Sequence, residues 1–338
     1  MSMQTPLVSV VAPVFNEEDG IAEFYERTTN AMETITPPVR HELVFVNDGS
    51  VDGSLDVLRK IASTDRRARV VDLSRNFGHQ LAITSGIDNA TGDAVVVIDA
   101  DLQDPPEVIA DMVQKWRDGF KVVYGVRTQR AGENRFKLWT AKTFYRVLNR
   151  LSDTPLPVDS GDFRLMDRKV VDALCELREE NRYIRGMVSW IGFSQTALEY
   201  ARDPRYAGET KYTMRKMVKF AVDGITSFSE KPLRVSIQMG LITCFISLFL
   251  ALVIVAGKVL EPTSALPGYA SLMVVVLFFG GVQLLSIGLL GEYVGRIYRE
   301  SKRRPLYFVA ERLNFSSDEG DANEVGGDSD DDRDGDGR

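Results

Sequence analysis

Two long uncharged segments in the C-terminal third constrain the fold of this chain most. Val235–Gly257 contains no charged residue, and neither does Pro262–Gly291. Each segment exceeds the roughly 20 residues that a helix needs to cross the hydrocarbon core of a bilayer. We therefore predict two transmembrane helices within residues 233–292, joined as a hairpin by the short link Lys258–Gly268. The alternative is a pair of buried core helices, which the length of both segments disfavours.

Basic residues gather on both outer flanks of this hairpin. They are Lys211, Arg215, Lys216, Lys219, Lys231 and Arg234 before it, and Arg296, Arg299, Lys302, Arg303 and Arg304 after it. Because short cytoplasmic flanks carry an excess of Lys and Arg, we expect a multi-pass protein of the cell membrane whose N-terminal domain and both termini are cytoplasmic. Residues 211–232 have apolar side chains at helical spacing, which predicts amphipathic helices in the membrane interface or, alternatively, ordinary surface helices. Residues 293–316 are expected to form a basic juxtamembrane segment.

The N-terminal part, residues 1–210, alternates short apolar runs with helical patterns. The predicted strands are Leu7–Val14, Leu43–Val46, Arg69–Leu73, Ala94–Ile98 and Lys121–Val126. The predicted helices are Glu17–Thr34, Asp52–Ser63, Gln80–Ala90 and Pro106–Arg117. This alternation is typical of an α/β domain with a doubly wound, mostly parallel sheet. Neither a G-x-G-x-x-G nor a G-x-x-x-x-G-K-[ST] motif occurs, which argues against a dinucleotide-dependent dehydrogenase and a P-loop NTPase.

Charge and composition exclude several kinds of site. The formal net charge is −7, but residues 317–338 hold ten acidic residues and two arginines, so the rest of the chain is nearly neutral. This acidic tail has no apolar periodicity and is expected to be disordered. The two cysteines and two histidines are too few and too scattered for a disulfide scaffold or a Cys- or His-rich metal centre. Any bound metal would therefore be held mainly by oxygen atoms.

Carboxylates follow the predicted strand Ala94–Ile98 directly. Asp99 and Asp101 are separated by one residue, and Gln103 follows two positions later. At the end of a buried strand, this spacing allows two carboxylates and an amide to converge on one hard divalent cation, Mg²⁺ or Mn²⁺. The alternative is two unrelated surface acids, because a D-x-D sequence alone is common.

Several motifs, taken together, resemble those of a known enzyme family. They are Pro13–Glu18, Val46–Ser50, Ser74–Gln80, Asp99–Glu107, Tyr124–Arg127, Ser160–Leu165 and Arg205–Tyr212. In order and spacing, residues 7–300 resemble the family 2 glycosyltransferases with the GT-A fold. The match is most specific to the polyprenyl-phosphate glycosyltransferases, a group that includes dolichyl-phosphate mannose synthase and the bactoprenol glucosyltransferases. One departure is Asn47, where many members of the wider family have an aspartate.

The resemblance implies a role for each matching residue. Pro13, Phe15, Glu17 and Asp48 would line the nucleotide pocket, and Arg205 and Lys211 would close over the donor from a loop. Asp99, Asp101 and Gln103 would hold the metal on the donor diphosphate.

Arg127 would bind the acceptor phosphate, with Lys137 and Arg164 as further candidates. Asp162 would face the acceptor, and we expect it to orient Arg164 or the acceptor loop more than to remove a proton, since a lipid phosphate arrives ionised. Asp101, Asp162 and Arg127 are thus the expected catalytic group.

The function that the resemblance implies is inverting transfer of a hexose from a nucleotide sugar to polyprenyl phosphate at the cytoplasmic face of a lipid bilayer. Glucose is the favoured sugar and UDP-glucose the favoured donor. No nucleic-acid partner is expected, and the sequence is compatible with a homo-oligomer. Two alternatives remain open at this stage: a processive polysaccharide synthase, although no Arg-Trp pair of the Q-x-x-R-W element occurs, and a non-catalytic membrane adaptor that retains a sugar-nucleotide fold.

Overall fold

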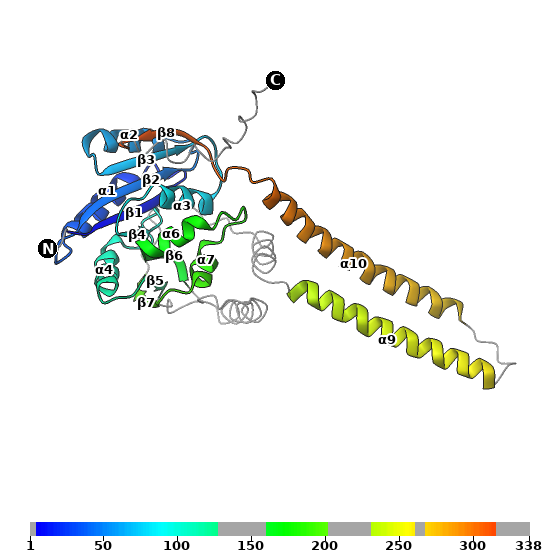
Figure 1. Cartoon of the computed structure of the whole chain (residues 1–338). Coiled ribbons are helices and arrows are strands. Elements are labelled where there is room, and N and C mark those ends of the chain that lie inside the picture. The colour runs from blue at the N-terminus through cyan, green and yellow to red at the C-terminus, as the bar shows by residue number, and fades with distance from the viewer. Residues whose placement is uncertain (1–4, 128–159, 202–230, 261–267, 316–338) are drawn as a thin grey trace, which may run out of the picture.

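The computed structural model describes residues 5–127, 160–201, 231–260 and 268–315. Its centre is an eight-stranded sheet with the strand order β7-β5-β6-β4-β1-β2-β3-β8 (Figure 1). The strands are β1 (Leu7–Val14), β2 (Arg40–Asn47), β3 (Ala68–Leu73), β4 (Ala94–Val97), β5 (Val122–Arg127), β6 (Ser160–Asp167), β7 (Gln195–Tyr200) and β8 (Val309–Leu313). The predicted α/β class and the mostly parallel sheet are confirmed.

The central strands are parallel because helices connect them across the faces of the sheet. β1 pairs in parallel with β2 and with β4, and β2 pairs in parallel with β3. Their side chains are apolar on both faces, as expected of strands covered by helices on two sides. Val8, Val10 and Val96 lie in one core layer, and Val11 and Val97 lie in the other.

Helices cover both faces of this sheet. They are α1 (Ile21–Glu33), α2 (Ser54–Thr64), α3 (His79–Asp88), the 3₁₀ turn η1 (Pro106–Val108), α4 (Ile109–Arg117), α6 (Arg168–Glu176) and α7 (Ile184–Ile191). α1, α2 and α4 contribute to one core layer, whereas α3, α6 and α7 contribute to the other. α1 begins later than the predicted Glu17 because the carbonyl oxygen of Glu17 accepts from the amides of Gly20 and Ile21 in a turn.

Two strands run antiparallel to the others, and neither was predicted from the sequence. β6 is antiparallel to both β4 and β5, which it separates, and β8 is antiparallel to β3 at the edge of the sheet. β8 belongs to residues 293–316, which the sequence predicted as a basic juxtamembrane segment. After the last helix, the chain therefore returns to the α/β domain and completes its sheet.

The C-terminal hairpin consists of α9 (Lys231–Leu260) and α10 (Tyr269–Ser301), which lie side by side and project from the α/β domain (Figure 1). The hydroxyl groups of Ser236 and Ser286 form a hydrogen bond of 2.8 Å between the two helices. Among the described residues, Phe278–Ser301 is long and apolar enough in composition to span a membrane. The predicted interface helices up to residue 230 and the acidic tail lie outside the described residues.

Candidate active site

Most of the candidate site residues lie at one edge of the sheet. β1, β2, β4 and β5 all end there with their carboxyl termini, because they run in the same direction. β6 runs the opposite way, so its first residues, Ser160 to Asp162, begin at this same edge. Ligands of open α/β sheets bind beyond the carboxyl ends of the strands. The topology therefore brings Asp48, Asp99, Arg127 and Asp162 to one region of the molecule.

Asp48, directly after β2, organises the loop that follows β3. Its carboxylate accepts hydrogen bonds from the backbone amides of Phe77 at 2.7 Å and Gly78 at 3.0 Å. Its own carbonyl oxygen accepts from the side-chain amide of Asn76 at 3.1 Å. Burial raises the pKa of Asp48, and the two backbone amides oppose that shift. Asp48 thus ties the Ser74–Gln80 motif to the end of β2.

The departure from the family pattern at Asn47 is explained by its contact with Asp72. Its side-chain amide donates to Asp72 at 2.7 Å, across the parallel pair β2–β3. An aspartate at position 47 would bring two carboxylates together, whereas the amide supplies the donor that Asp72 needs. The substitution is therefore compensated locally, and Asp48 keeps its place.

The residues after β1 form a tight turn beside Asp48. Asn16 has a φ of 57°, and its side chain accepts from the backbone amide of Val51 at 2.9 Å. The amide of Glu17 donates to the hydroxyl of Ser54 at 3.0 Å. Phe15 precedes this turn and leaves 46% of its surface exposed, while Pro13 is buried within β1. An exposed aromatic ring at this edge of the sheet offers a flat apolar surface for a planar ligand group.

The D-x-D sequence forms the sharp turn after β4. The amide of Gln103 donates to the Asp101 carboxylate at 3.1 Å, and Leu102 between them has a φ of 58°. Burial raises the pKa of Asp99 to about 6, with a contribution from the carboxylates of Asp162, Asp101 and Asp104 and against the opposing effect of His79. Asp99 Oδ1 is buried and accepts no hydrogen bond, and the nearest donor nitrogen, His79 Nε2, lies 3.4 Å away. Burial and the neighbouring carboxylates therefore make the ionised form of Asp99 unfavourable unless a positive charge lies nearby.

These features fit the predicted divalent cation. A buried carboxylate oxygen without a hydrogen bond, next to a second carboxylate two residues on, suits a hard cation that prefers oxygen ligands. Among the described residues, no group of three or more His, Cys, Asp and Glu side chains is placed to hold a metal ion. Asp99 and Asp101, with Gln103, would therefore leave part of the coordination shell to phosphate oxygens and water, as Mg²⁺ usually requires.

Asp162 is a buried carboxylate surrounded by donors. Arg185 of α7 donates to it through Nε at 2.9 Å and through a second nitrogen at 3.2 Å, and Gln80 donates at 3.2 Å. His79 Nε2 lies 3.3 Å from Asp162 and 3.4 Å from Asp99, so the imidazole bridges the two acids. Burial raises the pKa of Asp162, but the His79 hydrogen bond and the Arg185 charge outweigh burial and hold that pKa well below its usual range.

Arg127, the last residue of β5, is held by two neighbours. One terminal nitrogen of its guanidinium lies 3.2 Å from the Asp104 carboxylate, and its Nε donates to the Tyr200 hydroxyl at 3.3 Å. The Tyr200 hydroxyl donates in turn to Asp104 at 2.6 Å. Burial and the Asp104 charge raise the pKa of Tyr200, which keeps the phenol protonated. About a third of the Arg127 side chain remains exposed, so the guanidinium is oriented but still accessible.

The other predicted phosphate-binding residues have different environments. Arg164 is 3% exposed and donates to the backbone carbonyls of Gly161 and Asp162. Burial lowers the pKa of Arg164 to about 10. In this structure Arg164 therefore supports the start of β6 from within the protein. Lys137, Arg205 and Lys211 lie outside the described residues.

Sequence reasoning missed two residues of this cluster. Tyr200 is the last residue of β7, which pairs in parallel with β5, so the sheet direction places it beside Arg127. Recognition of β7 as a strand would have found it. Arg185 reaches Asp162 from a short helix, and no spacing or motif links those two positions in the sequence.

A mixed α/β sheet with paired carboxylates after a central strand is the arrangement expected of a GT-A glycosyltransferase. Comparison with known proteins agrees with this class. The family model "Glycosyl transferase family 2" matches residues 9–175, and the model "GtrB C-terminal hairpin" matches residues 231–297. The chain belongs to glycosyltransferase family 2 and is a glycosyltransferase.

Curated relatives cover nearly the whole chain. An uncharacterised glycosyltransferase of Bacillus subtilis, YkcC, is 52% identical over 89% of this chain and 92% of the relative. The bactoprenol glucosyl transferase of Shigella phage SfV is 43% identical over 89% of this chain and 97% of the relative. Among solved structures, a mannosyltransferase of Pyrobaculum calidifontis in complex with GDP-Man and Mn²⁺ is 16% identical, with a TM-score of 0.46, over 88% of each chain.

Proposed function

We propose that this protein transfers a hexose, with glucose favoured, from a nucleotide sugar to polyprenyl phosphate at the cytoplasmic face of the membrane. Two findings support the lipid acceptor. Relatives that are 41–43% identical over most of the chain are named bactoprenol glucosyl transferases, and the C-terminal hairpin has an apolar helix long enough to span a bilayer. A single site could then serve both a water-soluble donor and a lipid acceptor.

The observation that carries this proposal is that Asp162 is ionised and that its oxygen atoms are occupied by hydrogen-bond donors. A sugar hydroxyl must lose a proton to become a good nucleophile, and a general base works best with a pKa near the operating pH. The pKa of Asp162 is held far below that range, and Arg185, Gln80 and His79 occupy its oxygen atoms. A monoalkyl phosphate needs no such base, because its second pKa is about 6 and it is mostly dianionic at neutral pH.

The donor would bind at the carboxyl ends of β1, β2 and β4. Phe15 has an exposed ring that would meet the base, and Pro13, Glu17 and Asp48 would line the donor site beside it. Asp99, Asp101 and Gln103 would hold Mg²⁺ or Mn²⁺, which supplies charge compensation for the departing diphosphate. Arg205 and Lys211, which follow β7 in the sequence, would add positive charge. UDP-glucose is the donor that we favour.

The acceptor phosphate would meet Arg127. Asp104 and Tyr200 hold its guanidinium at two nitrogen atoms, which reduces the conformational freedom lost when phosphate binds. Lys137 is a second candidate for the same phosphate. An acceptor oxygen would attack the anomeric carbon of the sugar as the bond from that carbon to the donor diphosphate breaks, so that the nucleoside diphosphate leaves and the anomeric configuration inverts. Asp162 would act as a positioning residue that keeps His79 and Arg185 in place.

Both helices of the hairpin are proposed to span the bilayer, with the α/β domain and both termini in the cytoplasm. The basic flanks of the hairpin support this orientation. The return of the chain to the same sheet through β8 also supports an arrangement with both outer ends of the hairpin on one side. A reporter fused before Pro6 and a reporter fused after Phe315 should therefore report the same side, and opposite sides would contradict the two-span arrangement.

The decisive experiment is product identification. Membranes that contain the protein are incubated with a panel of labelled UDP- and GDP-sugars and polyprenyl phosphate, and the lipid fraction is analysed by mass spectrometry. The proposal requires a polyprenyl-phosphate hexose product that the Asp101→Ala variant does not form. Transfer to a growing polysaccharide, or no lipid-linked product from any donor, would contradict it.

A further inference from the structure

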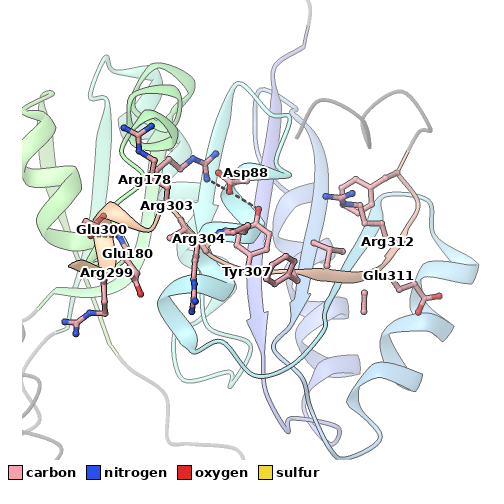
Figure 2. A pocket seen from close by; sticks show the side chains of 16 residues that line it. Asp88, Arg178, Glu180, Arg299, Glu300, Arg303, Arg304, Tyr307, Glu311 and Arg312 are labelled. Carbon is pink, nitrogen blue, oxygen red and sulfur yellow. Dashed lines mark hydrogen bonds and ion pairs between the residues drawn. The ribbon is translucent and has the colours of Figure 1, made fainter. Parts of the chain in front are cut away.

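A large pocket lies away from the donor and acceptor region, where α10 ends and the chain enters β8 (Figure 2). It has a volume of about 1070 Å³. Its lining includes Asp88 at the end of α3, whereas His79 of the candidate active site begins that helix. At 1.5 Å per residue, the ten residues of α3 separate the two regions by about 15 Å. The pocket is therefore a separate feature of the molecule.

Arginines dominate the charge available in this pocket. We call it the arginine pocket, after Arg178, Arg299, Arg303, Arg304 and Arg312 of its lining. Two acids of the lining, Asp88 and Glu311, are neutralised by ion pairs, which leaves Glu180 and Glu300 against a larger number of arginines. Asp88 binds Arg178 at 2.7 Å and accepts from Tyr307 at 2.8 Å, as Figure 2 shows. Glu311 binds Arg59 at 2.7 Å, whereas Glu300 accepts from the neutral backbone amide of Glu180 at 2.8 Å and keeps its charge.

The guanidinium groups that end α10 are not compensated in this way. Within the described part of the chain, Arg299, Arg303 and Arg304 form no side-chain hydrogen bond or ion pair, and all three are exposed. Arg312 adds a buried Nε atom that no described residue satisfies. Guanidinium groups that line one pocket repel each other, and a bound anion would reduce that repulsion. The arginine pocket therefore has the charge of an anion site.

The backbone at the end of α10 gives independent support. Arg303 follows the C-cap residue Lys302 and has a φ of 46°, a left-handed conformation that glycine usually provides at this position of a helix. A side chain costs stability in that conformation, and such strain clusters at functional sites. An arginine stands where glycine would be more stable, which suggests that its side chain serves a purpose other than helix termination.

The surroundings of the pocket indicate where the anion comes from. α10 is the apolar helix whose span ends at Ser301, so the pocket lies at the polar end of a membrane helix. Ile297, Tyr298 and Phe308 are exposed apolar or aromatic side chains in the same region. Aromatic side chains with a polar group favour the membrane interface, and cytoplasmic leaflets carry anionic phospholipids that attract juxtamembrane arginines.

We propose that the arginine pocket binds the phosphate headgroup of an anionic phospholipid, at a site distinct from that of the polyprenyl phosphate acceptor. Arg299, Arg303 and Arg304 contact the phosphate, while the exposed side chains of Ile297 and Phe308 face the acyl region. Since the pocket is lined by both α10 and β8, a bound lipid joins the membrane helix to the edge of the catalytic sheet. The site would thereby set the height and tilt of the active site above the bilayer.

The test uses the purified full-length chain in a neutral detergent. Phosphatidylglycerol or phosphatidylcholine is titrated in, and bound lipid is counted by native mass spectrometry. Phosphatidylglycerol should bind at least about tenfold more tightly than phosphatidylcholine. At roughly 1 kcal/mol per arginine near an anionic surface, the double variant Arg303→Gly/Arg304→Gln should bind phosphatidylglycerol about 30-fold more weakly. Equal binding of the two lipids by the unmodified chain, or unchanged binding by the double variant, would overturn the proposal.

Three controls separate the site from general charge effects. Lys60→Gln/Arg66→Gln removes the same charge from the exposed surface around α2 and should change binding less than twofold; an equal loss would mean that only net charge matters. The single variant Arg303→Gly should bind about fivefold more weakly without a lower thermal unfolding temperature, which excludes misfolding as the cause. Inorganic phosphate at millimolar concentration should not displace the lipid, and full displacement would identify a soluble phosphate as the ligand.

Discussion

Asp162→Asn separates a positioning role from a general-base role. The substitution keeps the shape of the side chain but removes the charge that Arg185 contacts at 2.9 Å and that lies beside the buried Arg164. Removal of one partner of a buried ion pair costs about 3–5 kcal/mol. Because about a quarter of the Arg185 side chain is exposed, we expect the lower end of that range, about 3 kcal/mol. The double variant Asp162→Asn/Arg185→Gln should recover part of this loss, since it removes both charges.

The pH dependence of this variant follows from the sign of the pKa shift. A carboxylate with a depressed pKa stabilises the fold fully above its ordinary pKa of about 3.8 and loses that effect only as the pH falls below it. Asp162 is therefore ionised throughout the range from pH 6 to pH 9. Over this range Asp162 itself adds no limb to the rate profile, so both the unmodified enzyme and Asp162→Asn should keep an acid limb near the acceptor's second pKa of about 6.

Two measurements test this reasoning on purified enzyme in detergent. Thermal unfolding reports the loss of stability, and transfer of labelled sugar to polyprenyl phosphate at pH 8 reports the rate. The rate should fall about tenfold or less, whereas loss of a general base costs about 10²–10⁴-fold. If Asp162→Asn is as stable as the unmodified enzyme, binds both substrates and is still inactive at pH 8, Asp162 is a base and the positioning role is wrong.

Three further predictions concern neighbouring parts of the site. Asp101→Ala should lower transfer by orders of magnitude, and EDTA should do the same to the unmodified enzyme; full activity in either case would remove the metal from the mechanism. Asn47→Asp should destabilise the domain by about 1–3 kcal/mol, because it leaves Asp72 facing another carboxylate, and added Asp72→Asn should restore the unfolding temperature. Tyr200→Phe should raise the KM for polyprenyl phosphate about fivefold with little change in kcat, because Arg127 loses one of its two contacts; a fall in kcat alone would contradict this role.

The fold was predictable to the extent that its elements have a local periodicity. Apolar runs predicted the positions of β1 to β5, and their alternation with helices predicted a mostly parallel sheet, as the structure confirms. β6 and β8 were not recognised because their sequences mix charged and apolar residues, as in Ser160–Asp167 and Val309–Leu313. Such strands are stabilised by pairing with distant neighbours, which a local pattern does not reveal.

The candidate site was predictable where motifs follow directly after strands. Asp48, Asp99 and Asp101 lie at the carboxyl edge of the sheet, where the order of strands and acids in the sequence predicted them. The environment of each residue was not predictable. Arg164 was expected at the acceptor phosphate, yet it is buried against backbone carbonyls of its own strand.

The sequence by itself determined the α/β class, the apolar hairpin and the family motifs, because hydrophobic periodicity and residue order act over short distances. Only the tertiary structure decided which charges meet. The ion pair of Asp162 with Arg185, the hydrogen bonds of Tyr200, and the arginine pocket, which brings Asp88 and Arg178 to the segment from α10 to β8, all join residues that are separated in the chain. Electrostatic energy depends on distance and burial in space, so these properties appear only when the chain is folded.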